Sequence, residues 1–414
     1  MIKENRLIDI EQPRMIYADN AATTALSPTA FRAMLPYFSQ IYGNPSSPHR
    51  FGQEAAAALC GAREQLAGLL GCSPRELYFT SGGSEADNQA ILSAAAFGAK
   101  QGKRHIISTA IEHHAVLRPL ERLAEQGFAV TLLPVPENGI AEPAALEAAL
   151  RPDTALVSVM YANNEIGTIQ PISEISRICR THGVLFHTDA VQAAGHLPVW
   201  LSDISNGACI DYLSLSAHKF HGPKGIGLLY ARRGVPLESL IAGGAQERGR
   251  RAGTENLPAI AGMAAALAES ISLMEETGRQ LIPLRDQLIR ELLQIPGSYL
   301  NGDPKRRLPG NINLCFDGIE GEALLLLLDA HGISASSGSA CTSGSLEPSH
   351  VLLALGRSPV LARSALRLSL GEETTEEDIS YISEVVRECV LRLRGSFQHS
   401  YTGESALTSR ARHL

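Results

Sequence analysis

The feature that most constrains the fold of this chain is an alternation of two patterns between residues 77 and 230. Short apolar runs of strand length occur at residues 77–80, 106–108, 129–133, 155–160, 184–187, 212–215 and 226–230. Between them, apolar residues recur at helical spacing over 84–97, 115–125, 143–150 and 172–182. Strands that alternate with helices of this length are typical of βαβ units. The sequence therefore predicts an α/β fold with a mostly parallel, seven-stranded sheet flanked by helices.

The chain on either side of this alternation is expected to be more helical. The spacing of apolar residues predicts a helix over 49–70, and long helices over 259–275 and 279–294, followed by mixed strands and helices. A final helix is predicted to begin at Thr375, where Asp378 completes a capping box. The apolar stripe of this helix consists of Ile379, Ile382, Val386, Cys389 and Leu393.

The length of the chain indicates more than one domain, because 414 residues are too many for a single small core. We expect a large domain over 15–258 and a smaller α+β domain made of 1–14 and 259–395. The remaining residues, 396–414, are polar and aperiodic, so we expect them to be disordered.

Composition argues against several classes of function. The net charge of −7 offers no basic surplus for binding nucleic acid. One of the longest apolar runs, 323–328, is far too short to cross a bilayer, so no membrane association is expected. The seven cysteines include no C-x-x-C pair, and an odd number argues against a disulfide framework. A reducing cytoplasm is therefore the expected location.

Two predicted strands are followed by residues that suit a cofactor. Lys219 follows 212–215, and a lysine amine can form a Schiff base with a carbonyl or with pyridoxal phosphate (PLP). Asp189 follows 184–187 and could keep a pyridine nitrogen protonated. Each residue alone has an ordinary explanation, since lysines are mostly exposed and an aspartate here could cap a helix. Because ligands bind where the carboxyl ends of such strands meet, we expect both side chains at one rim.

A third strand, 77–80, ends in Ser81-Gly-Gly-Ser84, where a helix is predicted to begin. Glycines let the backbone approach an anion closely, and a helix N-terminus offers unpaired N–H groups. This turn suits a phosphate, although an ordinary turn capped by Ser84 and Asp87 gives the same pattern. The G-x-G-x-x-G spacing of dinucleotide-binding folds and the Walker lysine are both absent.

Histidines near the predicted strand ends offer further chemistry. His113 could stack on a planar cofactor and move protons near neutral pH. Asn164 lies at another rim position, where an amide could hydrogen-bond a ring oxygen. The pairs His113/His114 and His218/His221 could suggest a metal, but neither brings the further carboxylate or cysteine that a site needs, so no metal is expected.

Cys341 stands in a stretch, 334–345, that otherwise holds only small and hydroxyl residues. A free cysteine is usually a buried small hydrophobe, but no large apolar neighbour in sequence would anchor this one. An exposed thiol on a glycine-rich loop is a candidate nucleophile. Arg367 alternates with apolar residues as in a strand, and it could bind a carboxylate in two-pronged fashion or simply be exposed.

With these residues laid out, the sequence over 15–395 closely resembles the cysteine desulfurases of iron–sulfur cluster assembly, of the NifS/IscS type. These are PLP enzymes of fold type I, in the aminotransferase superfamily. The motifs that carry the resemblance are Tyr17-Ala-Asp-Asn-Ala-Ala-Thr, Asn44-Pro-Ser-Ser, Phe79-Thr-Ser-Gly-Gly-Ser-Glu-Ala-Asp-Asn, Asn163-Asn-Glu-Ile-Gly and Ser216-Ala-His-Lys-Phe-His-Gly-Pro-Lys-Gly. The most specific one, Ser336-Ser-Gly-Ser-Ala-Cys-Thr-Ser-Gly-Ser-Leu-Glu-Pro-Ser-His, is similar to the long-loop group, and Gly249-Arg-Arg-Ala-Gly-Thr-Glu-Asn256 is similar to its NifS branch.

The resemblance implies a role for each matching residue. Lys219 would hold PLP and move a proton, His113 would stack on the ring, and Asp189 would pair with the ring nitrogen. Asn164 and Gln192 would contact the ring oxygen. The phosphate would be held by Gly83, Ser84, Ser216, His218 and, from the other subunit of a homodimer, Thr254. Asn164 and Arg367 would bind the carboxylate of the substrate. Cys341 would attack the sulfur of L-cysteine, release alanine and carry a persulfide.

Two other classes of function stay open on the sequence alone. An aminotransferase, or a lyase that acts on another amino acid such as selenocysteine, would share the PLP residues but would not need the thiol of Cys341. A cofactor-free scaffold that only docks assembly proteins would not need Lys219. The protein that accepts the sulfur, an iron–sulfur scaffold or another acceptor, and any specialisation for nitrogenase are not defined by these motifs.

Overall fold

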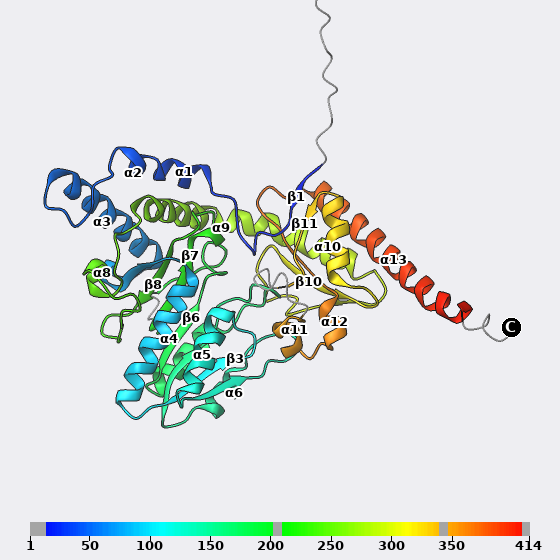
Figure 1. Ribbon diagram of the computed structural model, residues 1–414, viewed down its shortest axis with the longest axis horizontal. Helices are drawn as coiled ribbons and strands as arrows, with labels where there is room; N and C mark the ends of the chain where they lie inside the picture. The colour runs from blue at the N-terminus through cyan, green and yellow to red at the C-terminus, as the bar shows by residue number, and fades with distance from the viewer. Residues whose placement is uncertain (1–13, 202–208, 339–346, 408–414) are drawn as a thin grey trace, which may run out of the picture.

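A seven-stranded sheet forms the centre of the larger part of the molecule (Figure 1). The computed structural model describes residues 14–201, 209–338 and 347–407, without the side chains of 396–407. The strands are β2 (Leu77–Thr80), β3 (His105–Thr109), β4 (Ala129–Leu133), β5 (Thr154–Ser158), β6 (Leu185–Asp189), β7 (Tyr212–Ser216) and β8 (Gly227–Ala231). Their order is β2-β8-β7-β6-β5-β3-β4, and only the two pairs that include β8, with β2 and with β7, are antiparallel. The predicted fold class and the mostly parallel sheet are confirmed.

Helices cover both faces of this sheet. Those of the larger part are α1 (Pro28–Met34), α2 (Pro36–Ser39), α3 (Arg50–Leu70), α4 (Gly83–Lys100), α5 (His114–Glu125), α6 (Pro143–Ala149), α7 (Ile172–Thr181) and α8 (Gln246–Gly249). Strand β7 shows the two layers, because Leu213 and Leu215 pack in the same cluster as Leu66 of α3. Tyr212 instead packs with Ile91 of α4 on the other face. The strands are continuous apolar runs in the sequence because helices cover both faces of the sheet.

Helix α9 (Leu257–Leu292) connects the two parts of the molecule, and it corrects one prediction. Two helices were expected over 259–275 and 279–294, but the chain stays helical through Gly278. A glycine inside a helix costs about 1 kcal/mol, which burial of both halves offsets. Met263 packs in the core of the larger part and Leu288 in that of the smaller part.

By length and composition α9 could cross a membrane, and it is the one such helix in the part of the chain that the structure describes. Of its most apolar window, 44% is buried inside the molecule. A core helix gives the same signal, so α9 is no argument for a membrane span.

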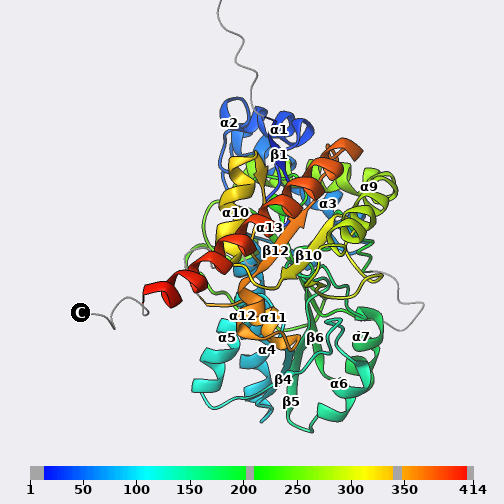
Figure 2. The same ribbon diagram turned by 90° about the vertical axis from the view of Figure 1, so that its right-hand side faces the viewer.

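The smaller part has a three-stranded antiparallel sheet, in which β10 (Asn311–Phe316) lies between β12 (Ala365–Ser369) and β9 (Ser298–Leu300). Helices α10 (Gly321–Ala330) and α13 (Glu376–Leu407) lie on its outer side (Figure 2). The other elements are β1 (Ile16–Tyr17), paired in parallel with β11 (Ile333–Ser334), and the short helices α11 (His350–Ala354) and α12 (Pro359–Arg363).

The ends of the chain differ from the expected domain limits. Ile16 and Ala18 pack in the core of the smaller part, so the expected limit at residue 15 falls inside a segment that belongs to that part. The capping box of α13 is confirmed, since Asp378 N donates to Thr375 Oγ1 at 3.2 Å and Thr375 N to Asp378 Oδ2 at 3.0 Å. Helix α13 continues to Leu407, past the limit at residue 395 that was expected for the smaller domain.

Candidate active site

A cavity of about 440 Å³ lies at the edge of the large sheet where the parallel strands end. This volume is typical of sites for small molecules. The predicted site residues that line it are Gly83, Ser84, His113, Asn164, Asp189, Gln192, Ser216, His218, Lys219 and Arg367. They come from the ends of β2, β6 and β7, from loops between elements, and from β12 of the smaller part. The structure thus brings together residues that lie far apart in the sequence.

Lys219 ends the single turn η3 (Ala217–Lys219) that directly follows β7. Its Nζ donates hydrogen bonds to the carbonyl oxygens of Ala21, at 2.6 Å, and Ala22, at 2.8 Å. The side-chain amide of Gln192 donates to the same Ala21 oxygen at 2.7 Å. A strand end, a tight turn and two carbonyl oxygens therefore hold the lysine amine at the wall of the cavity.

Asp189 is the last residue of β6 and is buried. Its Oδ1 accepts a hydrogen bond from Val191 N at 2.9 Å. Burial, and after it the nearby carboxylate of Asp87, raises the pKa of Asp189 to about 7. A cationic group placed against Asp189 would lower that pKa again. The carboxylate is therefore suited to hold a protonated ring nitrogen.

The turn before α4 brings backbone close to the cavity. A Cβ at Gly83 would lie 2.6 Å from Val191 Cγ2, so only glycine fits there without a shift. Gly82 forms the N-cap with no side-chain hydrogen bond, so the alternative capping box of Ser84 and Asp87 is not formed. The first turn of this long helix thus keeps N–H groups for an anion.

Two histidines of the cavity are neutral at pH 7. Burial and then the positive charge of Lys219 lower the pKa of His113 to about 4. The same two causes, with Lys224 added, lower the pKa of His218 to about 4. The Nδ1 of His113 also accepts from Ala115 N at 3.1 Å, which fixes the ring at the start of α5.

Arg367 carries a buried guanidinium to the cavity from the smaller part. The residue is 1% exposed, and its Nη2 donates to Asp19 Oδ1 at 2.8 Å. Its Nη1 donates to the carbonyl of Asn164 at 3.1 Å. Its Nε is buried and has no hydrogen-bond partner among the described residues. A buried unpaired donor is unfavourable, so a carboxylate bound there would be stabilised.

Two predicted site residues are not in this cavity. Cys341 lies outside the described residues. The residues that flank its stretch are close to the site: Ser336 pairs with Arg367, and His350 Nε2 lies 2.9 Å from the carbonyl oxygen of Glu112. Thr254 is exposed and lies outside the cavity of its own chain.

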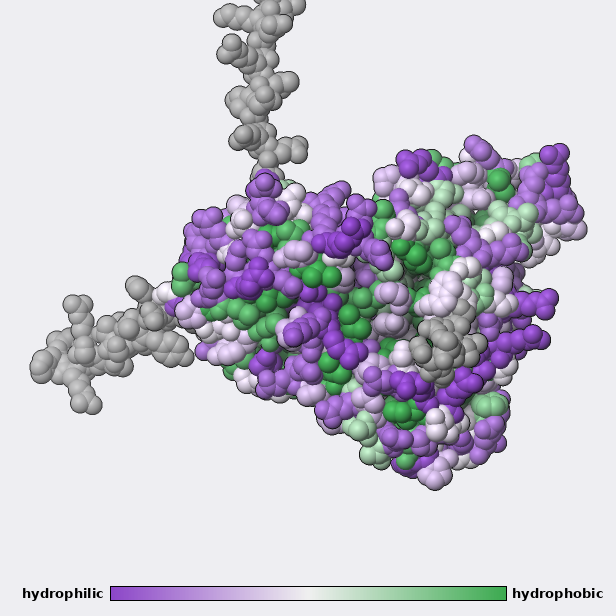
Figure 3. All heavy atoms as spheres, turned by 180° about the vertical axis from the view of Figure 1, so that it is seen from behind, coloured by the Kyte–Doolittle hydropathy of each residue, from purple (hydrophilic) through white to green (hydrophobic). Residues whose placement is uncertain are grey.

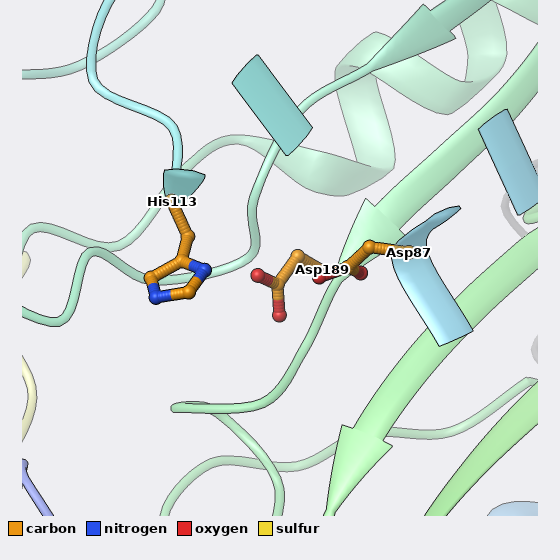
Figure 4. Close-up of side chains that lie close together, drawn as sticks. All are labelled: Asp87, His113 and Asp189. Atoms are coloured by element: carbon orange, nitrogen blue, oxygen red, sulfur yellow. The ribbon is translucent and has the colours of Figure 1, made fainter. Parts of the chain in front are cut away.

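The sequence did not identify every residue at the site. Asp19, which accepts a hydrogen bond from Arg367, appeared in the sequence analysis only as part of a motif. Asp87 was considered only as a possible cap, yet it lines the cavity, and its carboxylate points toward Asp189 and His113 (Figure 4). One polar atom from each of these three side chains lies within 4.8 Å of the other two. The sequence feature that could have identified Asp87 is its charge on the apolar face of α4, between Ala86 and Ala90.

In neither of the two histidine pairs considered for a metal do the two histidines lie together at one site. The rings of His113 and His114 are 6.4 Å apart, and His114 lies nearer to His350, at 4.7 Å between ring centres. His221 is 3.2 Å from Glu372 and does not line the cavity with His218.

Comparison with known proteins places this geometry in a family. The model of the aminotransferase class-V family matches residues 16–382. A curated relative named cysteine desulfurase IscS, from Methanosarcina thermophila, is 51% identical over 92% of this chain and 93% of its own length. A cysteine desulfurase IscS from Dictyoglomus turgidum is 47% identical over 92% of this chain and 96% of its own. A solved structure titled NifS-like protein superposes with a TM-score of 0.85, at 38% identity, over 92% of this chain and all of that one.

Proposed function

The chain belongs to the aminotransferase class V family, and we propose that within it the protein is a PLP-dependent cysteine desulfurase. It converts L-cysteine to L-alanine and keeps the sulfur as a persulfide on Cys341. The observation that carries this proposal is the convergence of Lys219, Asp189 and the first turn of α4 on one cavity. The resemblance to proteins named cysteine desulfurase supports the choice of reaction.

The residues of the cavity fit PLP. Gly83 leaves no room for a side chain, so the start of α4 can receive a phosphate with its backbone N–H groups. The Ser84, Ser216 and His218 side chains, from the same wall, add donors for that phosphate. Asp189 would hold the ring nitrogen in its protonated form, and that form makes PLP an electron sink. Lys219 is the amine that would hold the cofactor covalently.

The substrate carboxylate has a site beside the cofactor residues. The Nε of Arg367 is buried and unpaired among the described residues, while Asp19 and Asn164 fix the plane of the guanidinium. A fixed planar guanidinium binds a carboxylate with defined orientation. L-Cysteine bound there would present its α-carbon to Lys219, which moves the proton, with the neutral imidazole of His113 as a second acceptor.

The sulfur step needs one thiol from this chain. The Cys341 thiolate forms an S–S bond to the substrate sulfur, the C–S bond of the substrate breaks, and a proton takes the place of sulfur on carbon. The products are alanine and the Cys341 persulfide, so no external oxidant or reductant is consumed. An aminotransferase would not use this thiol. Transfer of the persulfide sulfur to an iron–sulfur scaffold or another acceptor follows in the cytoplasm.

A homodimer is part of the proposal. Large apolar side chains are exposed over α1, α2, the start of α3 and the segments that join them, where hydrophobic patches are visible at the upper right of Figure 3. These residues are Phe31, Leu35, Phe38, Tyr42 and Phe51, exposed by 47–65%. We call them the aromatic face. Contiguous exposed apolar surface marks interaction sites. In such a dimer Thr254, which is exposed here, would complete the phosphate site of the other subunit.

The test is a comparison of purified wild-type protein with Cys341→Ala. We expect both to show the visible absorbance of bound PLP, and only the wild type to release sulfide and alanine from L-cysteine in the presence of dithiothreitol. Cys60→Ala, which removes another exposed thiol, is the control and should retain activity. A colourless wild-type protein, or normal sulfide release by Cys341→Ala, would contradict the proposal.

A further inference from the structure

Asp87 is a buried carboxyl group that the proposed reaction does not use. It lies one turn after Gly83 on the face of α4 that packs on the sheet, and it is 1% exposed. Its neighbours on that face, Ala86, Ala90 and Ile91, are apolar. An ionisable group in such surroundings is costly unless it is neutral or paired.

A directed chain of hydrogen bonds ends on this carboxyl group. Ser158 Oγ lies 2.8 Å from His187 Nδ1, and His187 Nε2 lies 3.0 Å from Ser214 Oγ. The Ser214 hydroxyl in turn hydrogen-bonds Asp87. Burial lowers the pKa of His187 to about 4, so its ring is neutral. A neutral ring with the proton on Nε2 donates to Ser214, whose own proton then points to Asp87.

The second oxygen of Asp87, Oδ1, has no hydrogen-bond partner among the described residues. His187 Nε2 is 3.4 Å away, but its proton is taken by Ser214. Within 4.8 Å of one of the two carboxyl oxygens of Asp87 lie a carboxylate oxygen of Asp189 and a ring nitrogen of His113 (Figure 4). Two buried carboxyl groups this close do not both ionise, so one of them keeps a proton.

We propose that Asp87 is a positioning residue that keeps this proton and donates a hydrogen bond from Oδ1 to the ionised Asp189. The inference rests on the proposed function, because Asp189 needs its charge only if it faces a protonated ring nitrogen. One bridging water or a small rotation of either carboxyl group spans the separation. The role satisfies both oxygens of Asp87, since the other one accepts from Ser214.

The groups around the pair decide which carboxyl ionises. Asp189 accepts a backbone N–H from Val191 and is stabilised as an anion by Lys219. Among the residues that the structure describes, Asp87 receives a hydrogen bond from the neutral Ser214 hydroxyl, and no cation is among the groups that shift its pKa. The other titratable groups that face the pair are His187 of β6, His113 before α5 and Glu112, which burial keeps protonated. The anion is therefore more stable on Asp189.

The test measures the dissociation constant of PLP from reconstituted apoenzyme between about pH 6 and 9. Asp87→Asn keeps an acceptor for Ser214 and a donor for Asp189, so we expect its dissociation constant within about twofold of the wild type. Asp87→Leu removes the donor. We expect PLP binding at least about tenfold weaker, with the loss on acidification starting at higher pH, because an unsupported Asp189 is protonated more easily.

Controls separate this role from a general effect on α4. Gln89→Leu replaces another buried polar residue of the same helix that does not line the cavity, and it should bind PLP like the wild type. Circular dichroism reports folding, and Asp87→Ala is the second apolar variant if Asp87→Leu does not fold.

Three outcomes would overturn the inference and leave the proposed function in place. Asp87→Leu and Asp87→Ala could bind PLP with the wild-type pH profile, or Asp87→Asn could be as weak as the apolar variants. Saturable Zn²⁺ binding by wild-type apoenzyme that Asp87→Asn abolishes would assign the cluster to a cation instead. Failure of the wild type to bind PLP would overturn the proposed function and this inference together, whereas wild-type binding with unchanged variants overturns the inference alone.

Discussion

Glu112 illustrates at the scale of one residue how burial controls charge beside the cavity. It immediately precedes His113 and accepts hydrogen bonds from Thr109 Oγ1 at 2.6 Å and from Met160 N at 3.0 Å. These bonds favour the anion, but burial is the larger effect and raises the pKa of Glu112 to about 8. The folded protein therefore holds a proton at neutral pH that the unfolded chain releases.

This difference predicts a pH dependence of stability. Between the ordinary pKa of a glutamate and about 8, the native state binds more protons than the unfolded state, so stability falls as the pH rises. We expect the urea midpoint of the wild type, taken relative to that of Glu112→Gln at the same pH, to fall from about pH 5 to 8. Glu121→Gln, on the surface of α5, is the control with a wild-type slope. Parallel slopes for the wild type and Glu112→Gln would refute the assignment.

At the scale of elements, α9 shows how packing overrides a local signal. Gly278 lies inside the helix, where a Cβ would meet no atom within 4 Å. Gly278→Ala should therefore raise the free energy of unfolding by about 0.5–1 kcal/mol, because alanine loses less backbone entropy. Urea denaturation measures this change.

Gly262 of the same helix is the matched comparison. A Cβ there would lie 2.7 Å from Met34 Cγ and 3.2 Å from Pro223 Cδ, so Gly262→Ala should destabilise the protein. If Gly278→Ala were the destabilising member of the pair, a continuous α9 with an open position at residue 278 would be wrong.

The strands of the large sheet and the site residues at its edge could be predicted because each is marked by residues that are adjacent in the sequence. Apolar runs closed by Gly, Asp or Lys placed Gly83, Asp189 and Lys219 at strand ends, and parallel order then requires a shared edge. The continuity of α9 was not predictable, because it depends on two cores that form only in the folded chain. Asp87 was missed for the same reason, since its neighbours Asp189 and His187 come from β6, far along the sequence.

At the scale of the whole molecule, the aromatic face is expected to lie between subunits. Phe38, exposed by 62%, is within it, so Phe38→Glu would bury a charge in an apolar interface. We expect this variant to dissociate at protein concentrations at least about tenfold higher than the wild type, measured by sedimentation equilibrium. Val360→Glu changes a residue of α12 that is 70% exposed and should leave the assembly intact. A monomeric wild type would contradict the expectation.

The reaction of the whole enzyme is tested most directly by the mass of the peptide that contains Cys341 after incubation with L-cysteine and without a reductant. We expect that peptide to gain one sulfur atom in the wild type, and no gain in Lys219→Ala, which lacks the amine that we propose to hold the cofactor. Absence of the added sulfur in the wild type, or its equal appearance in Lys219→Ala, would contradict a PLP-dependent transfer of sulfur to Cys341.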